Sequence, residues 1–237
     1  MKRIGVFLAM VALCAAPQFV FAGDAAVFND IGFSEDGLTY LFGQYGKTDV
    51  TFQAWAEIYT VDVVKNDYVP NEVYKTSPSS ATEKQSGKEA YESLVKNTQW
   101  KTAKYNAKPA SAATLLYVCD SESKKGTDEI VFKDFESSTD SVSVYYYIKL
   151  VPTFYGSGKN LTSSFYINLE KRDQNGKVLG SYKVGTPDIR RKGISAYKIN
   201  SIFTDTSGKS LVFIVEKTLE DETGTSIRYM VETIRLF

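Results

Sequence analysis

The chain has 237 residues, of which 43% are hydrophobic and 24% charged, a composition typical of a globular protein. It contains no histidine, which excludes imidazole-based catalytic triads and His-ligated zinc or copper. Its 28 Lys and Arg residues are balanced by 28 Asp and Glu residues, whereas a nucleic-acid-binding surface needs an excess of positive charge. We therefore expect no cofactor and no nucleic-acid partner.

The N-terminal residues predict a secretory signal peptide at residues 1–22. Lys2 and Arg3 precede an uncharged apolar run, and small residues occupy the two positions that signal peptidase reads before a cut after Ala22. We expect a secreted or periplasmic mature domain at residues 23–237. An uncleaved membrane anchor is disfavoured because the apolar run is short for a membrane-spanning helix. No later segment is apolar over about 18 residues, so no stable membrane span is expected after cleavage.

One segment has the features of a helix. Ser86 and Glu89 form the S-x-x-E pattern of a capping box, and apolar residues then recur at helical spacing. The pattern predicts a single helix over residues 87–105, a helical insertion that begins at about residue 86. The polar stretch at residues 70–80 before it is predicted to be a connecting loop, and residues 121–128 an exposed charged turn.

Most of the remaining chain alternates between apolar and polar residues with the period of a β-strand. Residues 142–150 place an apolar or aromatic side chain at every even position. The alternating segments 165–169 and 178–184 are separated by Asn175 and Gly176, a strong hairpin signal because both residue types tolerate positive φ. The sequence therefore predicts antiparallel strands.

Three further segments are predicted strands. Residues 211–215 are apolar at every position, which is typical of a central strand covered on both faces. Residues 226–237 form a final strand, and residues 115–119 end at Cys119, interpreted as a small buried residue. Removal of the signal peptide also removes Cys14, so no intramolecular disulfide is expected.

The expected fold is a single mainly β domain, with antiparallel sheets in propeller-blade-like or sandwich-like units and one inserted α-helix. An internal similarity links residues 33–42 to residues 203–213. Each segment has an aromatic residue, a polar turn with glycine and an apolar strand, and a second strand follows at 56–63 or 227–234. Two matches do not establish a repeat.

The same segments carry a resemblance to known families. Phe33-Ser34-Glu35-Asp36-Gly37 and the strand at 56–63 resemble a blade unit of the periplasmic TolB-type propellers. Together with residues 207–216 and 226–233, they resemble a family of bacterial predicted secreted proteins that is classified as a domain of unknown function. This resemblance covers nearly all of the mature chain. It implies export and a β-rich fold, and it implies no catalytic residues.

Short motifs do not add up to a catalytic site. Gly208-Lys209-Ser210 lacks the earlier glycine of a phosphate-binding loop, since Phe203 stands in its place. The S-x-x-K patterns that begin at Ser121 and Ser195 lack the accompanying K-T-G element. Acidic pairs such as Glu216 with Glu220 are interpreted as solvated turns. We expect no catalytic, cofactor-binding or metal-ligating residues.

Aromatic residues are the one enrichment, at 14% of the chain. Trp55, Tyr145 and Tyr147 are candidates for a face that binds a sugar or a peptide. The competing interpretation, which we favour, is that these residues pack in the β-core.

We therefore expect an exported, non-enzymatic binding or envelope-scaffolding domain whose partners are envelope proteins or glycans. One alternative is a small envelope hydrolase that uses carboxylates. The other is an outer-membrane β-barrel, although Arg235 and Thr233 would then face lipid.

Overall fold

The computed structural model describes residues 24–119, 129–221 and 224–236, with the side chain of Asp221 excepted. The predicted signal peptide and the predicted turn at 121–128 lie outside these residues. The strands are β1 (Val27–Phe33), β2 (Thr39–Lys47), β3 (Ala54–Asp62), β4 (Asp67–Thr76), β5 (Leu115–Val118), β6 (Ile130–Asp134), β7 (Val144–Tyr155), β8 (Thr162–Asp173), β9 (Val178–Val184), β10 (Arg191–Lys192), β11 (Ile194–Thr204), β12 (Ser210–Asp221) and β13 (Gly224–Arg235). One α-helix, α1 (Gly87–Thr102), and three short 3-10 helices at Ser80–Thr82, Ala103–Tyr105 and Gly158–Asn160 complete the described elements.

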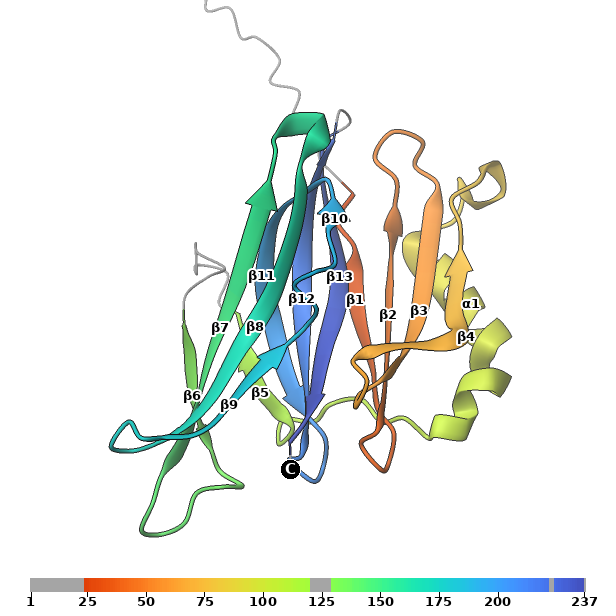
Figure 1. Ribbon diagram of the computed structural model, residues 1–237. Coiled ribbons are helices and arrows are strands. Elements are labelled where there is room, and N and C mark those ends of the chain that lie inside the picture. Colours follow the sequence, from red (N-terminus) through yellow and green to blue (C-terminus); the bar gives the residue numbers. More distant parts are fainter. Residues whose placement is uncertain (1–23, 120–128, 222–223, 237) are drawn as a thin grey trace, which may run out of the picture.

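The strands form three antiparallel sheets. The N-terminal sheet has the order β1-β2-β3-β4, and the central sheet has the order β13-β12-β11-β5. The outer sheet has the order β10-β8-β7-β6, with β9 paired to β8 as well. Figure 1 shows the green and cyan strands of the outer sheet on one side of the blue central strands, with the orange N-terminal sheet and α1 on the other side. The expected fold class, mainly antiparallel β with one inserted helix, is confirmed.

The central sheet is covered on both faces, as the apolar run at 211–215 predicts. Leu211, Phe213 and Val215 pack into a core with the inward side chains of the outer sheet. Val212 and Ile214 pack into a second core against the N-terminal sheet. All five side chains are at most 1% exposed, so β12 has no solvent-facing side along this stretch. Because sheets pack face to face on both sides of the central sheet, the units are sandwich-like and not propeller-blade-like.

The helix covers the far side of the N-terminal sheet and has the predicted extent. α1 continues into the 3-10 helix Ala103–Tyr105, and Ser86 and Glu89 form the capping box at its start. Buried Ala90 and Leu94 pack on Ala54, Ala56 and Ile58 of β3, as the third apolar core shows. Tyr91 lies over Gly43 of β2, where an added Cβ would stand 2.4 Å from its ring. The glycine therefore permits the close approach of the helix to the sheet.

The internal similarity in the sequence corresponds to two three-stranded meanders. β1-β2-β3 and β11-β12-β13 each run as consecutive antiparallel strands, and they pack face to face in the second core. The first hairpin turn of each meander contains a glycine with positive φ, 67° at Gly37 and 68° at Gly208. The sheets stack in layers, however, and do not radiate as blades around a channel. The resemblance to propeller blades is therefore not supported.

The edge of the central sheet at β13 is covered by groups from the first part of the described chain. Three backbone amides donate outward: Ile227 to the Asp24 carbonyl (2.9 Å), Tyr229 to Gln44 Oε1 (2.8 Å) and Thr233 to Asn66 Oδ1 (2.6 Å). Asn66 lies in the turn between β3 and β4 with φ at 53°, a left-handed conformation that asparagine tolerates. An edge strand with satisfied amides is a poor template for pairing with another chain.

The predicted loop at 70–80 is wrong in its first half, because β4 extends to Thr76. Proline lowers the strand propensity of this segment, but β4 is an edge strand with a register shift opposite Tyr59 and Val61 of β3. Asn71, next to Pro70, has a φ of 64° at this irregularity. A proline is tolerated at an edge or bulge because its missing N–H breaks no ladder hydrogen bond.

Three smaller expectations also need correction. Val142 precedes β7 and is exposed, so the inward face of the strand begins at Val144. In the hairpin between β8 and β9, Gly176 alone of the two turn residues adopts positive φ, at 81°. Cys119 follows β5 and is partly exposed rather than buried, although its amide still donates to the Asn200 carbonyl of β11 at 2.8 Å.

Candidate functional site

Tyr145 and Tyr147 lie on the solvent side of the outer sheet. β7 alternates strictly, with Val144, Tyr146 and Ile148 buried in the core and the two tyrosines between them half-buried on the opposite side. None of the described helices or strands forms a further layer on that side (Figure 1). The alternation of the sequence thus predicts the direction of these side chains, and the structure leaves them accessible.

The pairing of the strands brings basic side chains next to these tyrosines. Tyr145 stands opposite Arg172 of β8 and Lys133 of β6, and Tyr147 stands opposite Glu170. We call the outward side of β6–β9 the tyrosine face, and define it by Lys133, Tyr145, Tyr147, Lys149, Tyr166, Glu170, Arg172 and Lys183. Four of these residues are cationic and one is anionic; Glu129, just before β6, flanks the face.

The cations of this face are held against the aromatic rings. The Arg172 guanidinium lies 4.2 Å from the Tyr147 ring centroid, and the Lys183 ammonium lies 4.8 Å from that of Tyr166. Arg172 Nε also donates to Glu170 Oε2 at 2.8 Å, and this hydrogen bond lowers the pKa of the Glu170 carboxyl. Contacts of this kind fix the positions of charges on an otherwise flexible surface.

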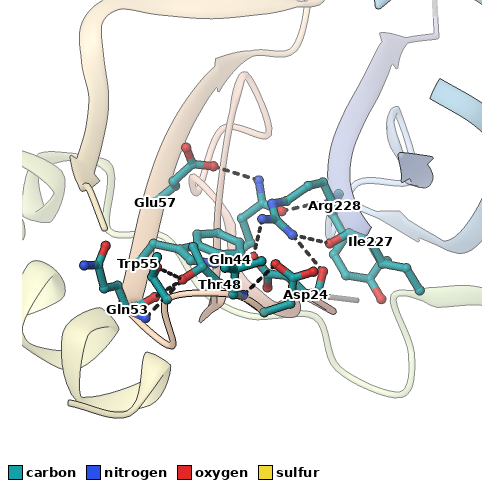
Figure 2. Close-up of polar contacts among 12 residues, drawn as sticks. Asp24, Gln44, Thr48, Gln53, Trp55, Glu57, Ile227 and Arg228 are labelled. Atoms are coloured by element: carbon teal, nitrogen blue, oxygen red, sulfur yellow. Dashed lines mark hydrogen bonds and ion pairs between the residues drawn. The ribbon is translucent and has the colours of Figure 1, made fainter. Parts of the chain in front are cut away.

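Trp55 has a different environment, at the junction of the N-terminal and central sheets. Its side chain is 5% exposed, and its indole N–H donates to Asp24 Oδ2 at 2.8 Å. The Arg228 guanidinium lies 4.1 Å from the ring centroid and forms an ion pair with the same carboxylate (Figure 2). Burial raises the pKa of Asp24, although the charge and hydrogen bond of Arg228 oppose that shift.

A small polar pocket adjoins this junction. It has a volume of about 180 Å³ and is lined by Thr48, Trp55, Glu57, Lys75, Thr76, Ser77, Pro78 and Arg228. Glu57 accepts from Gln44 Nε2 at 2.9 Å and pairs with Lys75 at 2.9 Å. Burial opposes ionisation of Glu57, but hydrogen bonds from Tyr59 and Lys75 outweigh it and lower the pKa. Glu57 of the pocket is thus already paired with Lys75, and Arg228 is paired with Asp24.

Lys217 on β12 lies within a group of charges contributed by all three sheets. Burial is the main cause that lowers its pKa to about 8, and the positive charges of Arg191, Arg228 and Lys75 act in the same direction. Glu57 alone among the main contributors opposes the shift. A lysine with a pKa near neutrality is a recognised mark of a functional or strained position.

The three candidate aromatics therefore do not form one site. The tyrosine face contains Tyr145 and Tyr147, whereas Trp55 is separated from them by the central sheet. Their binding roles stay predictions. Tyr166, Arg172 and Lys183 are not among the predicted site residues, because their proximity to the tyrosines depends on the register of β8 with its neighbours. The alternation of residues 165–169 identifies the outward positions of β8 but not what stands beside them.

The described residues contain no group of three or more Cys, Asp or Glu side chains arranged to hold a metal ion. Glu216 and Glu220, interpreted as parts of solvated turns, both lie within strand β12, and Glu216 pairs with Lys198 at 3.3 Å. Among the described helices, none is long and apolar enough to cross a membrane.

Comparison with known proteins supports the expected family. The model of DUF2259, a family of predicted secreted proteins, matches residues 41–235. No curated protein and no solved structure matches the chain. The matched residues, well over half of the chain, include α1 and strands of all three sheets, whereas β1 and the first two residues of β2 lie outside the match. The chain therefore belongs to the DUF2259 family of predicted secreted proteins.

Proposed function

We propose that this protein is an exported, non-enzymatic binding protein whose tyrosine face binds an anionic glycan. The observation that carries the proposal is the set of half-buried tyrosines and fixed cations on the uncovered side of the outer sheet. The flat faces of sugar rings pack on aromatic side chains, and carboxylate or sulfate groups pair with Lys and Arg. An extended sheet face suits a polymer better than a small molecule, which needs a concave pocket.

The arrangement of charges favours an anionic polymer over a neutral one. Arg172 and Lys183 already lie against tyrosine rings, so little side-chain freedom is lost when an anionic group binds them. Lys149 of β7 and Lys183 of β9 stand on the two sides of Asn168 of β8, and Lys149 is exposed and has no ion-pair partner among the described residues. A polymer bound in this way is held without any cleavage chemistry, which distinguishes the proposal from a carboxylate-based hydrolase.

Affinity electrophoresis tests this proposal. The mature protein is run in native gels that contain heparin or alginate, with dextran as the uncharged reference. We expect retardation by the anionic polymers that falls as salt is raised. The variant Lys149→Gln/Lys183→Gln should bind at least about tenfold more weakly, the loss expected for about 1.4 kcal/mol of charge-assisted contacts.

The matched control is Lys88→Gln/Lys96→Gln, which removes two exposed charges from α1. It should migrate like the wild type in the presence of polymer. Equal losses in both variants, or retardation by dextran as well, would overturn the proposal. Shortening of the polymer during incubation would favour the hydrolase instead, and capture of an acidic envelope protein in place of a glycan would favour a scaffolding role.

A further inference from the structure

The first described residues of the chain are fixed to the edge of the central sheet. Ile227 donates its amide to the Asp24 carbonyl at 2.9 Å, and the Ala26 amide donates to the Ile227 carbonyl at 3.0 Å. Residues 24–26 therefore run parallel to the start of β13. Cleavage at the predicted position makes Gly23 the first residue of the exported chain, directly before this anchored segment.

One oxygen of the Asp24 carboxylate is buried and lacks a hydrogen-bond partner. The Asp24 side chain is 4% exposed, and its Oδ2 accepts from the Trp55 indole and pairs with Arg228 (Figure 2). Its Oδ1 has no partner among the described residues. A carboxylate oxygen that loses its hydration and gains no donor destabilises the folded state. Oδ1 is therefore an acceptor that still lacks a donor.

The charges around this carboxylate favour a cation as the missing donor. Burial is the main cause that raises the pKa of Asp24, and the negative charge of Asp49 acts in the same direction, against Arg228. Asp49 lies in the turn between β2 and β3 and has no ion-pair partner among the described residues; its Oδ1 accepts from the Val50 amide at 2.9 Å. Among the main contributors Arg228 is the one cation, so a second cation beside Oδ1 is stabilising.

The α-ammonium of Gly23 is a cation that the chain itself can supply at this place. In the precursor the Gly23 nitrogen is a neutral amide, and it becomes an ammonium group only when the signal peptide is removed. Three covalent bonds separate it from the Asp24 nitrogen, so the two nitrogens lie within about 4 Å of each other in any backbone conformation. Glycine also has no side chain to restrict the approach of its own nitrogen to the carboxylate.

We propose that signal-peptide cleavage completes this junction, with the new α-ammonium of Gly23 donating to Asp24 Oδ1. The mature chain then has a cation at each oxygen of the carboxylate, whereas the precursor has one oxygen without a donor. Cleavage thus strengthens the attachment of residues 24–26 to β13. The inference rests on the predicted cleavage site and is independent of the proposed glycan binding, because the central sheet separates this junction from the tyrosine face.

Two chains with defined N-termini test the proposal. One begins at Gly23, and the other retains Phe21 and Ala22, which moves the ammonium group two residues away and leaves the net charge unchanged. We expect the equilibrium constant for unfolding, measured by urea denaturation, to be at least about tenfold larger for the extended chain, as the loss of a charge-assisted hydrogen bond predicts. Equal stabilities, or a more stable extended chain, would overturn the proposal.

Two substitutions, each made in both chains, identify the partner of the ammonium group. Asp24→Asn should remove most of the difference between the chains, because the neutral amide no longer attracts the cation. Asp49→Asn, at a partly exposed position of the neighbouring turn, should retain most of it. A tenfold difference that survives Asp24→Asn would contradict the assignment.

Two measurements without substitutions decide the question even if Asp24→Asn fails to fold. The first is the rate at which acetic anhydride modifies the α-amino group, followed by mass spectrometry of the N-terminal peptide. An ion pair raises the pKa of the amine, so the chain that begins at Gly23 should react at least about tenfold more slowly than the extended chain. The second is the mass of the protein exported from cells that make the precursor. Equal rates, or an exported chain that begins at any residue other than Gly23, would overturn the proposal.

Discussion

Trp55 and Tyr147 are both aromatic residues on β-strands, yet they have opposite surroundings. Trp55 is covered by Arg228 and hydrogen-bonded to Asp24, and neither partner is near it in sequence. Tyr147 is half-buried on the solvent side of the outer sheet, with Arg172 of the neighbouring strand against its ring. Alternation in the sequence shows that each residue lies on one side of a strand. It does not show whether another layer covers that side, because the covering layer comes from distant segments.

Removal of Arg228 should destabilise the fold through Asp24. In Arg228→Met the methionine retains contact with Trp55, but the Asp24 carboxylate, whose side chain is 4% exposed, loses its cation. We expect a loss of about 3 kcal/mol in the free energy of unfolding, at the lower end for a buried pair because the arginine is partly exposed. Urea denaturation measures it.

The control for this prediction is Lys65→Met, which breaks an exposed pair with Asp62. It should change the free energy of unfolding by less than about 1 kcal/mol. If the two variants lost equal stability, the buried junction would have no special role. The double variant Asp24→Asn/Arg228→Met should recover part of the loss, since no buried charge then lacks a partner.

At the scale of elements, the sequence predicts most strands and the helix, but β1, β4, β6, β10 and β11 are not among the predicted strands. The capping box at Ser86 and the alternation along β7 are local patterns, so both are confirmed without tertiary information. β4 is missed because Pro70 is acceptable only at the edge of a sheet, and the sequence does not show which strand is at an edge. Only part of the tyrosine face can be predicted from the sequence, because the sequence does not show how neighbouring strands are aligned. Its tyrosines follow from alternation, whereas its cations depend on register.

The cap of α1 gives a test with a matched control. Ser86 Oγ accepts from the Glu89 amide at 3.2 Å, so Ser86→Ala should lower the free energy of unfolding by about 1 kcal/mol. The same substitution at the exposed mid-helix residue Ser93 should raise it slightly, by up to about 0.5 kcal/mol, because alanine has the higher helix propensity. Urea denaturation of both variants measures the difference. Changes of the same sign would show that the cap does not determine the start of the helix.

At the scale of the whole molecule, the central sheet is the layer on which both other sheets pack. Its buried side chains belong to two separate apolar cores. Charges from all three sheets act on Lys217 of β12, which is half-buried there. The stacking order of the sheets is not visible in the sequence, apart from the doubly apolar run of β12, because sheet order depends on contacts between segments far apart in the chain.

Lys217 should make stability depend on pH in the alkaline range. Its pKa is about 8 in the folded state against 10.5 in the unfolded chain, so between these values the unfolded state holds more protons and stability rises with pH. Below pH 8 the Lys217 ammonium is protonated in both the folded and the unfolded state. The folded state is then destabilised by the full free energy of burying that charge. Lys217→Met should therefore exceed the wild type by about 1–3 kcal/mol at pH 7, and the advantage should shrink towards pH 10.

Urea denaturation at pH 7, 8, 9 and 10 measures this difference. Lys209→Met, at an exposed position just before β12, is the control and should differ from the wild type by the same small amount at every pH. A constant difference for Lys217→Met would show that its ammonium group is solvated in the folded state.

The position of the central sheet in the chain has a consequence for how the protein is made. A ribosome delivers β1–β4 and α1 first and the strands β11–β13 last. Until those last strands arrive, the apolar sides of both earlier sheets have nothing to cover them, so the growing chain holds two incomplete half-sandwiches. The last forty or so residues thus convert two exposed surfaces into cores in one step. A nascent chain that stalls before β12 should therefore be bound by chaperones and cut by proteases more readily than the finished chain, in which both cores are complete.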